Sequence, residues 1–192
     1  MAKALVHLLR SIGRSRGFGV QSPTDYDYLR YVLCESWPYY AYRPLRRSHR
    51  AASCRLHRLG RLLLRVANDL QPRHVFLCTH ADDALLSDYI HGGCRSAQIT
   101  HSPDDAPLWV VDACEWPACL PDGCGPDEAL PPSVRVLVLT GIHGDAPSEQ
   151  LWNHVLEDSR AVASYDFFHF GVVVTGHRQT PHHYLVSQFW DF

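Results

Sequence analysis

The sequence places a histidine and two aspartates where a short apolar run gives way to a helical pattern. The stretch VFLCTHADDALLSDY runs from Val75 to Tyr89, and its first polar residues include His80, Asp82 and Asp83. A histidine and a carboxylate can bind zinc, and a second carboxylate can act as general base on a metal-bound water. The junction of a strand and a helix can also hold a polar cofactor. That use normally requires glycine, because backbone must approach the ligand closely, and this turn contains none.

The same residues are similar to the His-Pro-Asp-Asp signature of zinc-dependent sugar N-deacetylases. This resemblance implies that His80 and Asp83 bind zinc and that Asp82 is the general base. The proline and the following glutamate of the signature are absent, and a long segment precedes it. A catalytic zinc site needs a further protein ligand. The sequence offers three histidines for that position without distinguishing among them: His101, His143 and His169.

Short apolar runs alternate with helical patterns and predict the elements that position these residues. Strands are expected over 75–78, 97–100, 107–113 and 134–141. Helices are expected over 50–70, 82–90 and 148–160. In the first helix leucines keep the helical period and arginines occupy the other face. We expect Gly92 and Gly93 to close the second helix and Ser148 to be the N-cap of the third.

The two ends of the chain follow other patterns. Helices are expected over 4–12 and 23–35, the second with Ser22 as N-cap. Two β-like runs flank DFFHF within 161–176, and with a last strand over 183–190 they predict an antiparallel hairpin. The order predicts an α/β fold with a Rossmann-like, doubly wound and mostly parallel sheet. We divide the chain into an N-terminal helical extension, 1–49, and one domain, 50–192.

Composition excludes several classes of protein. The chain has 192 residues and a net charge of −2, so it can bury one sizeable core and carries no excess charge that would favour nucleic acid or a membrane surface as partner. No apolar run approaches membrane-spanning length, and the N-terminus lacks an apolar signal core. Seven cysteines, an odd number without a secretory signal, predict a reduced, cytoplasmic protein.

Four further groups of residues have two interpretations each. The arginines of 43–65 are expected on a solvated helix face, in preference to a nucleic-acid patch. The segment WPYYAYRPLRR, 37–47, is expected to be a connector, and its aromatic run WPYYAY, 37–42, is expected to cap the core, in preference to lining a pocket. The adjacent His182 and His183 should point to opposite faces of a strand and so should not share a metal. Free thiols are favoured over a metal site at three evenly spaced cysteines, because metal knuckles use closer pairs: Cys114, Cys119 and Cys124.

Three longer stretches occur in a recognisable order: GFGVQSPTDYDYLRYVL (17–33), HRLGRLLLRVANDLQPRHVFL (57–77) and VLVLTGIHGDAPSEQLWNHVLEDSRAVASYDFFHFGVVV (136–174). Together they resemble a family of class I S-adenosylmethionine-dependent methyltransferase-like proteins common in Bacteroidetes. The resemblance covers both ends of the chain but not its middle. It implies a methyltransferase fold, in which 75–78 is the first strand of the cofactor-binding sheet.

The departures from the family pattern fall at the cofactor site. The family has an acidic residue and a glycine-rich loop after the first strand, where this chain has Cys78 to Asp83. Two carboxylates therefore stand where the methionine carboxylate of the cofactor should lie, and they would repel it. The acid expected after the second strand is displaced or absent. Asp112 matches the family's acid after a later strand, and His143 persists although Thr140 and Gly141 replace the two acids of its motif.

The segment between residues 100 and 107 is too short for the helical crossover that the family has there, so one edge strand should be missing. A sheet that has lost an edge can pair with a second copy of the chain, and a homo-oligomer is the one partnership that we expect.

The resemblance therefore predicts a methyltransferase-like protein that is degenerate and non-catalytic, with a binding or structural role and no cofactor. One alternative is an active methyltransferase with an altered loop, whose chemistry would rest mostly on positioning by strand-end residues. The other is the zinc hydrolase with His80 and Asp83 as ligands. An open cleft beside residues 78–83 would favour activity. S-adenosylmethionine would then contact six residues: Thr79, His80, Asp82, Asp83, Asp112 and His143.

Overall fold

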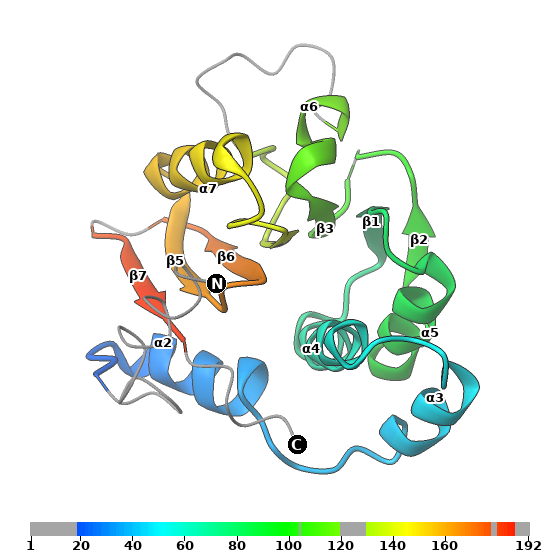
Figure 1. The fold of residues 1–192 in the computed structure, drawn as a ribbon. Helices are drawn as coiled ribbons and strands as arrows, with labels where there is room; N and C mark the ends of the chain where they lie inside the picture. Colours follow the sequence, from blue (N-terminus) through cyan, green and yellow to red (C-terminus); the bar gives the residue numbers. More distant parts are fainter. Residues whose placement is uncertain (1–18, 104, 120–129, 178–179, 187–192) are drawn as a thin grey trace.

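The computed structural model describes residues 19–103, 105–119, 130–177 and 180–186, so the expected helix 4–12 lies outside it (Figure 1). In this part of the chain no helix has both the length and the apolar character that crossing a bilayer requires. The helical elements are α2 (Pro23–Tyr28), a π-helical turn (Leu29–Leu33), α3 (Tyr42–Ser48), α4 (Cys54–Leu70), α5 (Asp83–Gly93), a 3₁₀ turn (Ala113–Glu115), α6 (Trp116–Cys119) and α7 (Ala146–Glu157).

Seven strands form one mixed sheet in the order β2-β1-β3-β4-β6-β5-β7. Every neighbouring pair is parallel except the two pairs of β6, which runs antiparallel to β4 and to β5. The expectation of an α/β fold with a mostly parallel sheet is confirmed. The strands are β1 (His74–Cys78), β2 (Gln98–Thr100), β3 (Leu108–Asp112), β4 (Val136–Thr140), β5 (Ala161–Asp166), β6 (Phe170–Thr175) and β7 (His182–Leu185).

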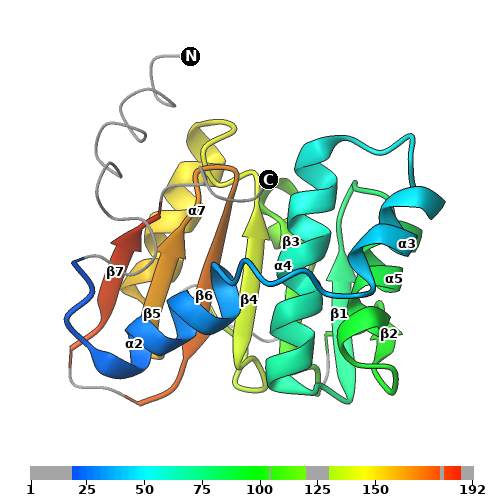
Figure 2. The same ribbon diagram turned by 90° about the horizontal axis from the view of Figure 1, so that it is seen from below.

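Helices cover both faces of the sheet (Figures 1 and 2). Alternate residues of each central strand point to opposite faces, as the pleat requires. Leu77 and Val110 join the core under α4 and α5, whereas Phe76 and Trp109 join a second core with Trp152 of α7. The central strands are apolar on both faces because helices bury both, which is why 134–141 gives the strongest strand pattern.

Helix α4 follows its sequence pattern closely. Ser53 is its N-cap and accepts a hydrogen bond from the N–H of Leu56 at 3.2 Å. The expectation that all its arginines face solvent is wrong for Arg65, which is only 2% exposed. Its guanidinium donates to the carbonyl oxygens of Val32 and Leu33, at 2.8 and 2.7 Å, and so satisfies the end of the π-helical turn.

Two helix boundaries differ from the expectation. Gly92 and Gly93 are the last two residues of α5, whose C-cap is Cys94, and α4 passes so close that a Cβ at Gly93 would overlap the carbonyl oxygen of Leu64. The N-cap of α7 is Asp145 and not Ser148, whose own N–H donates to the Asp145 carboxylate at 2.8 Å. The pattern located both helices, but tertiary packing decided the role of the glycines.

The C-terminal hairpin is also arranged differently. β5 and β6 form the antiparallel hairpin, but β6 lies inside the sheet between β4 and β5 instead of at its edge. The last strand pairs parallel with β5 and is an edge strand. Its two histidines contact different elements, since His182 bonds Asp25 of α2 and His183 bonds Ser164 of β5, both at 2.8 Å. Their side chains therefore point to different elements, in agreement with the alternation of side chains along a strand.

The N-terminal helices belong to the same core as the sheet. Ser22 caps α2 as expected, accepting from the N–H of Asp25 at 3.3 Å. Leu29 and Leu33 are buried with the residues of α4 and α5, so no gap in packing marks residue 49. The division at residue 49 stays a prediction. Helix α3 lies in a segment whose prolines and aromatic residues predicted a connector.

Candidate functional site

Strand register brings several of the expected site residues into one row. Parallel pairing sets Asp112 beside Thr140, and antiparallel pairing sets Thr140 beside Phe170. Asp166 pairs with Gly171 in the next ladder. The carboxyl ends of β1, β3, β4 and β5 therefore meet the start of β6 at one edge of the sheet. In open α/β sheets this edge, near the point where strand order reverses, is where ligands bind.

The polar side chains of the turn after β1 make local contacts. Asp82 is the N-cap of α5 and accepts from the N–H of Leu85 at 3.0 Å. Asp83 accepts from the hydroxyl of Thr79 at 3.2 Å. His80 contacts Glu115 through its Nε2, at 2.6 Å from a carboxylate oxygen. Each of these four expected site residues thus already has a partner within the fold.

Asp112 ties this turn to the neighbouring strands. It accepts a hydrogen bond from the backbone N–H of His80 at 2.6 Å and another from the hydroxyl of Thr140. Burial raises the pKa of Asp112, while the hydrogen bond and the charge of His80 oppose that rise. The carboxylate therefore bridges β1, β3 and β4, and it holds the turn after β1 against the end of β3.

The structure does not place His80 and Asp83 in a common metal site. In the described part of the chain, the single group of three candidate ligands with atoms within 4.8 Å of one another is His80, Cys114 and Glu115. Burial raises the pKa of the Cys114 thiol, and the charges of Asp112 and Glu115 raise it further, which disfavours the thiolate that would bind a metal. Cys124 and the side chain of Cys119 lie outside the described residues.

His143 is held between two carboxylates. Its Nε2 lies 2.8 Å from Asp166 and its Nδ1 lies 3.4 Å from Glu149. The hydrogen bond to Asp166 raises the pKa of His143, although burial lowers it. The ring also stacks on Phe168, whose φ of 70° is unusual for a residue other than glycine. The two carboxylates therefore favour the protonated form of His143.

A cleft of about 520 Å³ opens beside this row, and we call it the edge cleft. Its volume lies within the range of about 300–1,000 Å³ that suits small-molecule ligands. Apolar walls come from α4 and from the β5–β6 turn, and polar groups come from the strand ends. The lining residues are Ser53, Arg55, Leu56, Leu59, Ala81, Asp112, Thr140, Gly141, His143, Gly144, Phe168, His169 and Phe170.

The remaining junction residues line a different and smaller hollow. Thr79, His80 and Asp83 face a pocket of about 210 Å³ with His101 and Glu115. The ring of His101 reaches back to the carbonyl oxygen of Leu77, at 3.2 Å, and so lies across the ends of β1 and β2. The space beside residues 78–83 is thus divided, with Ala81, Asp112 and His143 at the edge cleft and Thr79, His80 and Asp83 at the smaller pocket.

Sequence reasoning found three residues of the edge cleft and missed its apolar walls. Asp112 and His143 were candidates because polar residues follow strand patterns, and His169 was one of three histidines offered as a further zinc ligand. Leu56 and Leu59 carry no such signal, because a helical leucine stripe predicts core contact. Phe168 and Phe170 were part of a recognised motif, but their pattern did not say that they face a cleft.

The fold and the edge cleft define an α/β protein with a candidate ligand site at the carboxyl edge of a mixed sheet. Comparison with known proteins adds no closer assignment: no protein-family model matches the chain, and neither curated proteins nor solved structures give a match. The methyltransferase resemblance therefore stays a prediction from the motifs.

Proposed function

We propose that this chain is a methyltransferase-like protein without methyl-transfer activity, which binds a small ligand in the edge cleft. The proposal rests on one observation: the residues of the junction after β1 already make hydrogen bonds within the fold. Asp82 caps a helix, Asp83 accepts from Thr79, and Asp112 accepts from two neighbouring segments. Groups that already satisfy one another are costly to redirect toward a cofactor, since each broken bond leaves a polar group without a partner.

The finer description of the fold supports the same proposal. β2 has only three residues and lies at the sheet edge, and β3 begins eight positions after β2 ends, at Leu108. That connection cannot contain the crossover helix and extra strand of the resembled family. The strand order of the sheet is accounted for by a Rossmann-like, doubly wound sheet that has lost its outermost strand.

S-adenosylmethionine fits the strand ends poorly. The turn after β1 presents His80 and the two carboxylates where a close backbone approach and a non-acidic surface are needed. His101 lies over the ends of β1 and β2. Both carboxylate oxygens of Asp112 already accept hydrogen bonds, one from the His80 N–H and one from the Thr140 hydroxyl. No step of methyl transfer follows from this arrangement.

The edge cleft suits a mostly apolar ligand with a polar end. Leu56, Leu59 and Phe170 supply apolar surface, while Arg55 and His143 supply polar groups at its rim. Gly141 and Gly144, in the loop between β4 and α7, carry no side chains, so the ligand can approach the backbone at these two positions. Such a site needs positioning groups but no reactive ones, in agreement with a binding role.

Calorimetric titration of S-adenosylmethionine and of S-adenosylhomocysteine into the full chain tests the proposal. We expect no binding with a Kd below about 1 mM, and a known S-adenosylmethionine-dependent enzyme in the same buffer verifies the ligands. If binding occurs, two variants locate it: Ala81→Trp, which fills the edge cleft, and Ala51→Trp, an exposed position away from it. Micromolar binding that only Ala81→Trp abolishes would establish the alternative, an active methyltransferase with an altered loop.

A further inference from the structure

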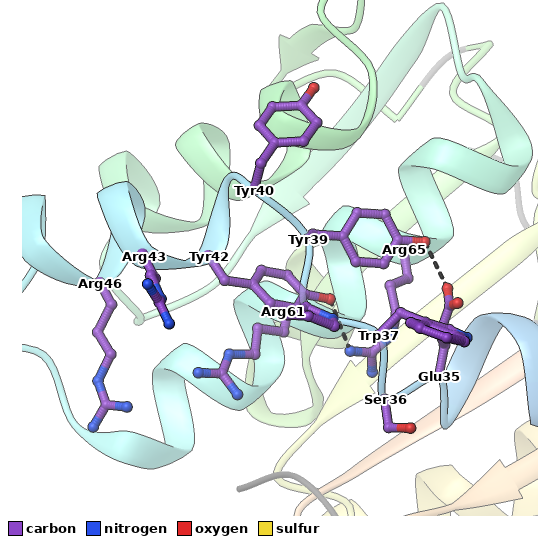
Figure 3. A pocket seen from close by; sticks show the side chains of 11 residues that line it. Glu35, Ser36, Trp37, Tyr39, Tyr40, Tyr42, Arg43, Arg46, Arg61 and Arg65 are labelled. Atoms are coloured by element: carbon purple, nitrogen blue, oxygen red, sulfur yellow. Dashed lines mark hydrogen bonds between the residues drawn. The ribbon is translucent and has the colours of Figure 1, made fainter.

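A second pocket lies on the far side of α4, and nothing in the proposed function uses it. It has a volume of about 560 Å³ and is walled by α3, α4 and the connector that joins the π-helical turn to α3 (Figure 3). We call it the arginine pocket and define it by Arg43, Arg46, Arg61, Arg65, Trp37 and Tyr42. Helical spacing explains the convergence, since residues three or four positions apart share a helix face: 43 and 46 on α3, 61 and 65 on α4.

The pocket carries an excess of positive charge. Four arginines line it, and the one carboxylate among the lining residues is Glu35, which accepts a hydrogen bond from Tyr39 at 2.6 Å. No carboxylate of the described residues lies within 4.0 Å of the guanidinium groups of Arg43, Arg46 or Arg61. Burial lowers the pKa of the nearby His57, and the charges of Arg46 and Arg61 lower it further. Both observations indicate a local surplus of positive charge.

The four arginines do not have the same role. Arg65 is buried, and its guanidinium donates hydrogen bonds to the carbonyl oxygens of the π-helical turn and to the hydroxyl of Tyr42. Arg43 and Arg46 are exposed and have no partner of that kind among the described residues. Arg61 stacks over the ring of Tyr42 at 5.0 Å, and its Nε is buried without a hydrogen-bond partner. A buried donor without a partner is costly, so this site favours a ligand that accepts hydrogen bonds.

Aromatic surface lies next to these charges. Trp37 is 74% exposed, although its ring would normally be buried. Tyr39 and Tyr42 pack against each other with ring centres 5.3 Å apart, and Tyr42 thereby presents its ring between Tyr39 and Arg61. In Figure 3 the ring of Tyr40 points away from the others, so Trp37 is the exposed aromatic residue best placed at the pocket. The core-capping interpretation of WPYYAY is wrong for Trp37 and Tyr40.

We infer that the arginine pocket binds a nucleotide, with its phosphates on Arg43, Arg46 and Arg61 and its base on Trp37. Guanidinium groups match phosphate oxygens in geometry and charge, and exposed aromatic rings stack on any base. The residues line a pocket of about 560 Å³, a size that suits a small-molecule ligand, whereas a membrane-binding surface needs no pocket. The nucleotide can be free or can be the end of a single strand, because both offer one base and a phosphate.

Calorimetry with ATP, inorganic pyrophosphate and a short 5′-phosphorylated oligothymidylate tests the inference at about 50 mM salt, where phosphate contacts are weakly screened. ATP should bind at least about fivefold more tightly than pyrophosphate, because stacking adds to the phosphate contacts. Tighter binding of the oligonucleotide would identify a single strand as the ligand, and tighter binding of ATP a free nucleotide. Nucleotide binding in the arginine pocket does not depend on the edge cleft. Its presence or absence is therefore independent of the proposed function.

Matched variants decide whether binding occurs in this pocket. The double variant Arg43→Gln, Arg46→Gln should weaken ATP binding by roughly tenfold or more, since each guanidinium makes charge-assisted contacts. Arg47→Gln is its control, because Arg47 lies on α3 but does not line the pocket. Trp37→Ala should weaken ATP binding about fivefold, and Tyr31→Ala, which removes an exposed aromatic ring elsewhere, should not.

Three results would overturn the inference. Pyrophosphate binding as tightly as ATP would show an anion site without base recognition. An Arg47→Gln variant as weak as the double variant would show general attraction by the arginine-rich surface. Binding to vesicles of phosphatidylserine and phosphatidylcholine in the absence of nucleotide binding would show a membrane surface instead.

Discussion

The junction after β1 and the arginine pocket contain similar numbers of charged side chains. The two regions differ in whether neighbouring residues supply partners for these side chains. At the junction, Asp82, Asp83 and Asp112 all accept hydrogen bonds from neighbouring parts of the fold. In the arginine pocket, Arg43 and Arg46 have no such partners in the described residues, and like charges are gathered on each helix face. The first arrangement stabilises a fold, whereas the second costs stability and is explained by a ligand.

This difference reverses the ranking that residue types alone suggest. A histidine and two aspartates after a strand are typical of catalytic and metal sites, and arginines on a helix are typical of a solvated face. The hydrogen-bond and ion-pair partners of each side chain decide between these interpretations. A side chain that has its partners within the fold contributes to stability, whereas a side chain that has none can contribute to ligand binding. The comparison can be tested by asking which of these groups the protein needs in order to fold.

The largest effect is expected from Asp112→Ala. The substitution removes the acceptor of the His80 N–H and of the Thr140 hydroxyl, so the free energy of unfolding should fall by about 2–4 kcal/mol. Urea unfolding measures the change. Asp83→Ala is the control, because it removes only the exposed contact to Thr79 and should cost less than about 1 kcal/mol. Equal losses in the two variants would contradict the structural role of Asp112.

His143 should contribute stability that depends on pH. The hydrogen bond to Asp166 raises the pKa of His143 above its ordinary value of 6.5. The contribution is therefore fully present below the unfolded pKa and is lost as pH rises through the folded pKa. His143→Gln should lower the free energy of unfolding by about 1–2 kcal/mol at about pH 6 and by less above neutrality. A loss that is constant from about pH 5.5 to about pH 8.5 would show that packing on Phe168, and not charge, is lost.

A smaller effect should separate helix capping from chemistry at Asp82. Asp82→Ala removes the side chain that accepts from the Leu85 N–H and should cost about 1 kcal/mol. Asp82→Ser keeps a capping oxygen and should restore most of this loss, although it has no carboxylate. Thermal unfolding of both variants measures the difference. If serine were no better than alanine, Asp82 would require its charge and the capping account would be wrong.

The sequence predicted the sheet and its flanking helices well, because their apolar periods are set by burial. The strands of the sheet centre are apolar on both faces, and the Ser22 cap and α4 followed their local signals. The errors came where distant contacts decided the outcome. Gly93 is the last residue of α5 and lets α4 pass close by, and Gly171 allows the Trp152 ring to lie on the sheet. Trp152 of α7 and Gly171 of β6, which both lie in the stretch 136–174, thus pack against each other.

The candidate sites were harder to predict, since a site depends on which groups lack partners. Asp112 and His143 were located at strand ends, but their partners Thr140 and Asp166 emerge only from strand register. The arginine pocket was not predicted, for a different reason. Periodicity placed the arginines of α4 on one face, but the pocket depends on a short helix in a segment that was expected to be a connector.

The smallest effect on stability is expected where the largest effect on binding is proposed. Arg43 and Arg46 are exposed and make no ion pair with the described residues, so Arg43→Gln with Arg46→Gln should change the free energy of unfolding by less than about 0.5 kcal/mol. Relief of repulsion between like charges should make any change favourable, and more so at low salt. Urea unfolding at two salt concentrations measures it beside Arg47→Gln. A clear loss of stability would mean that these arginines hold α3 in place, and the contrast between the two regions would disappear.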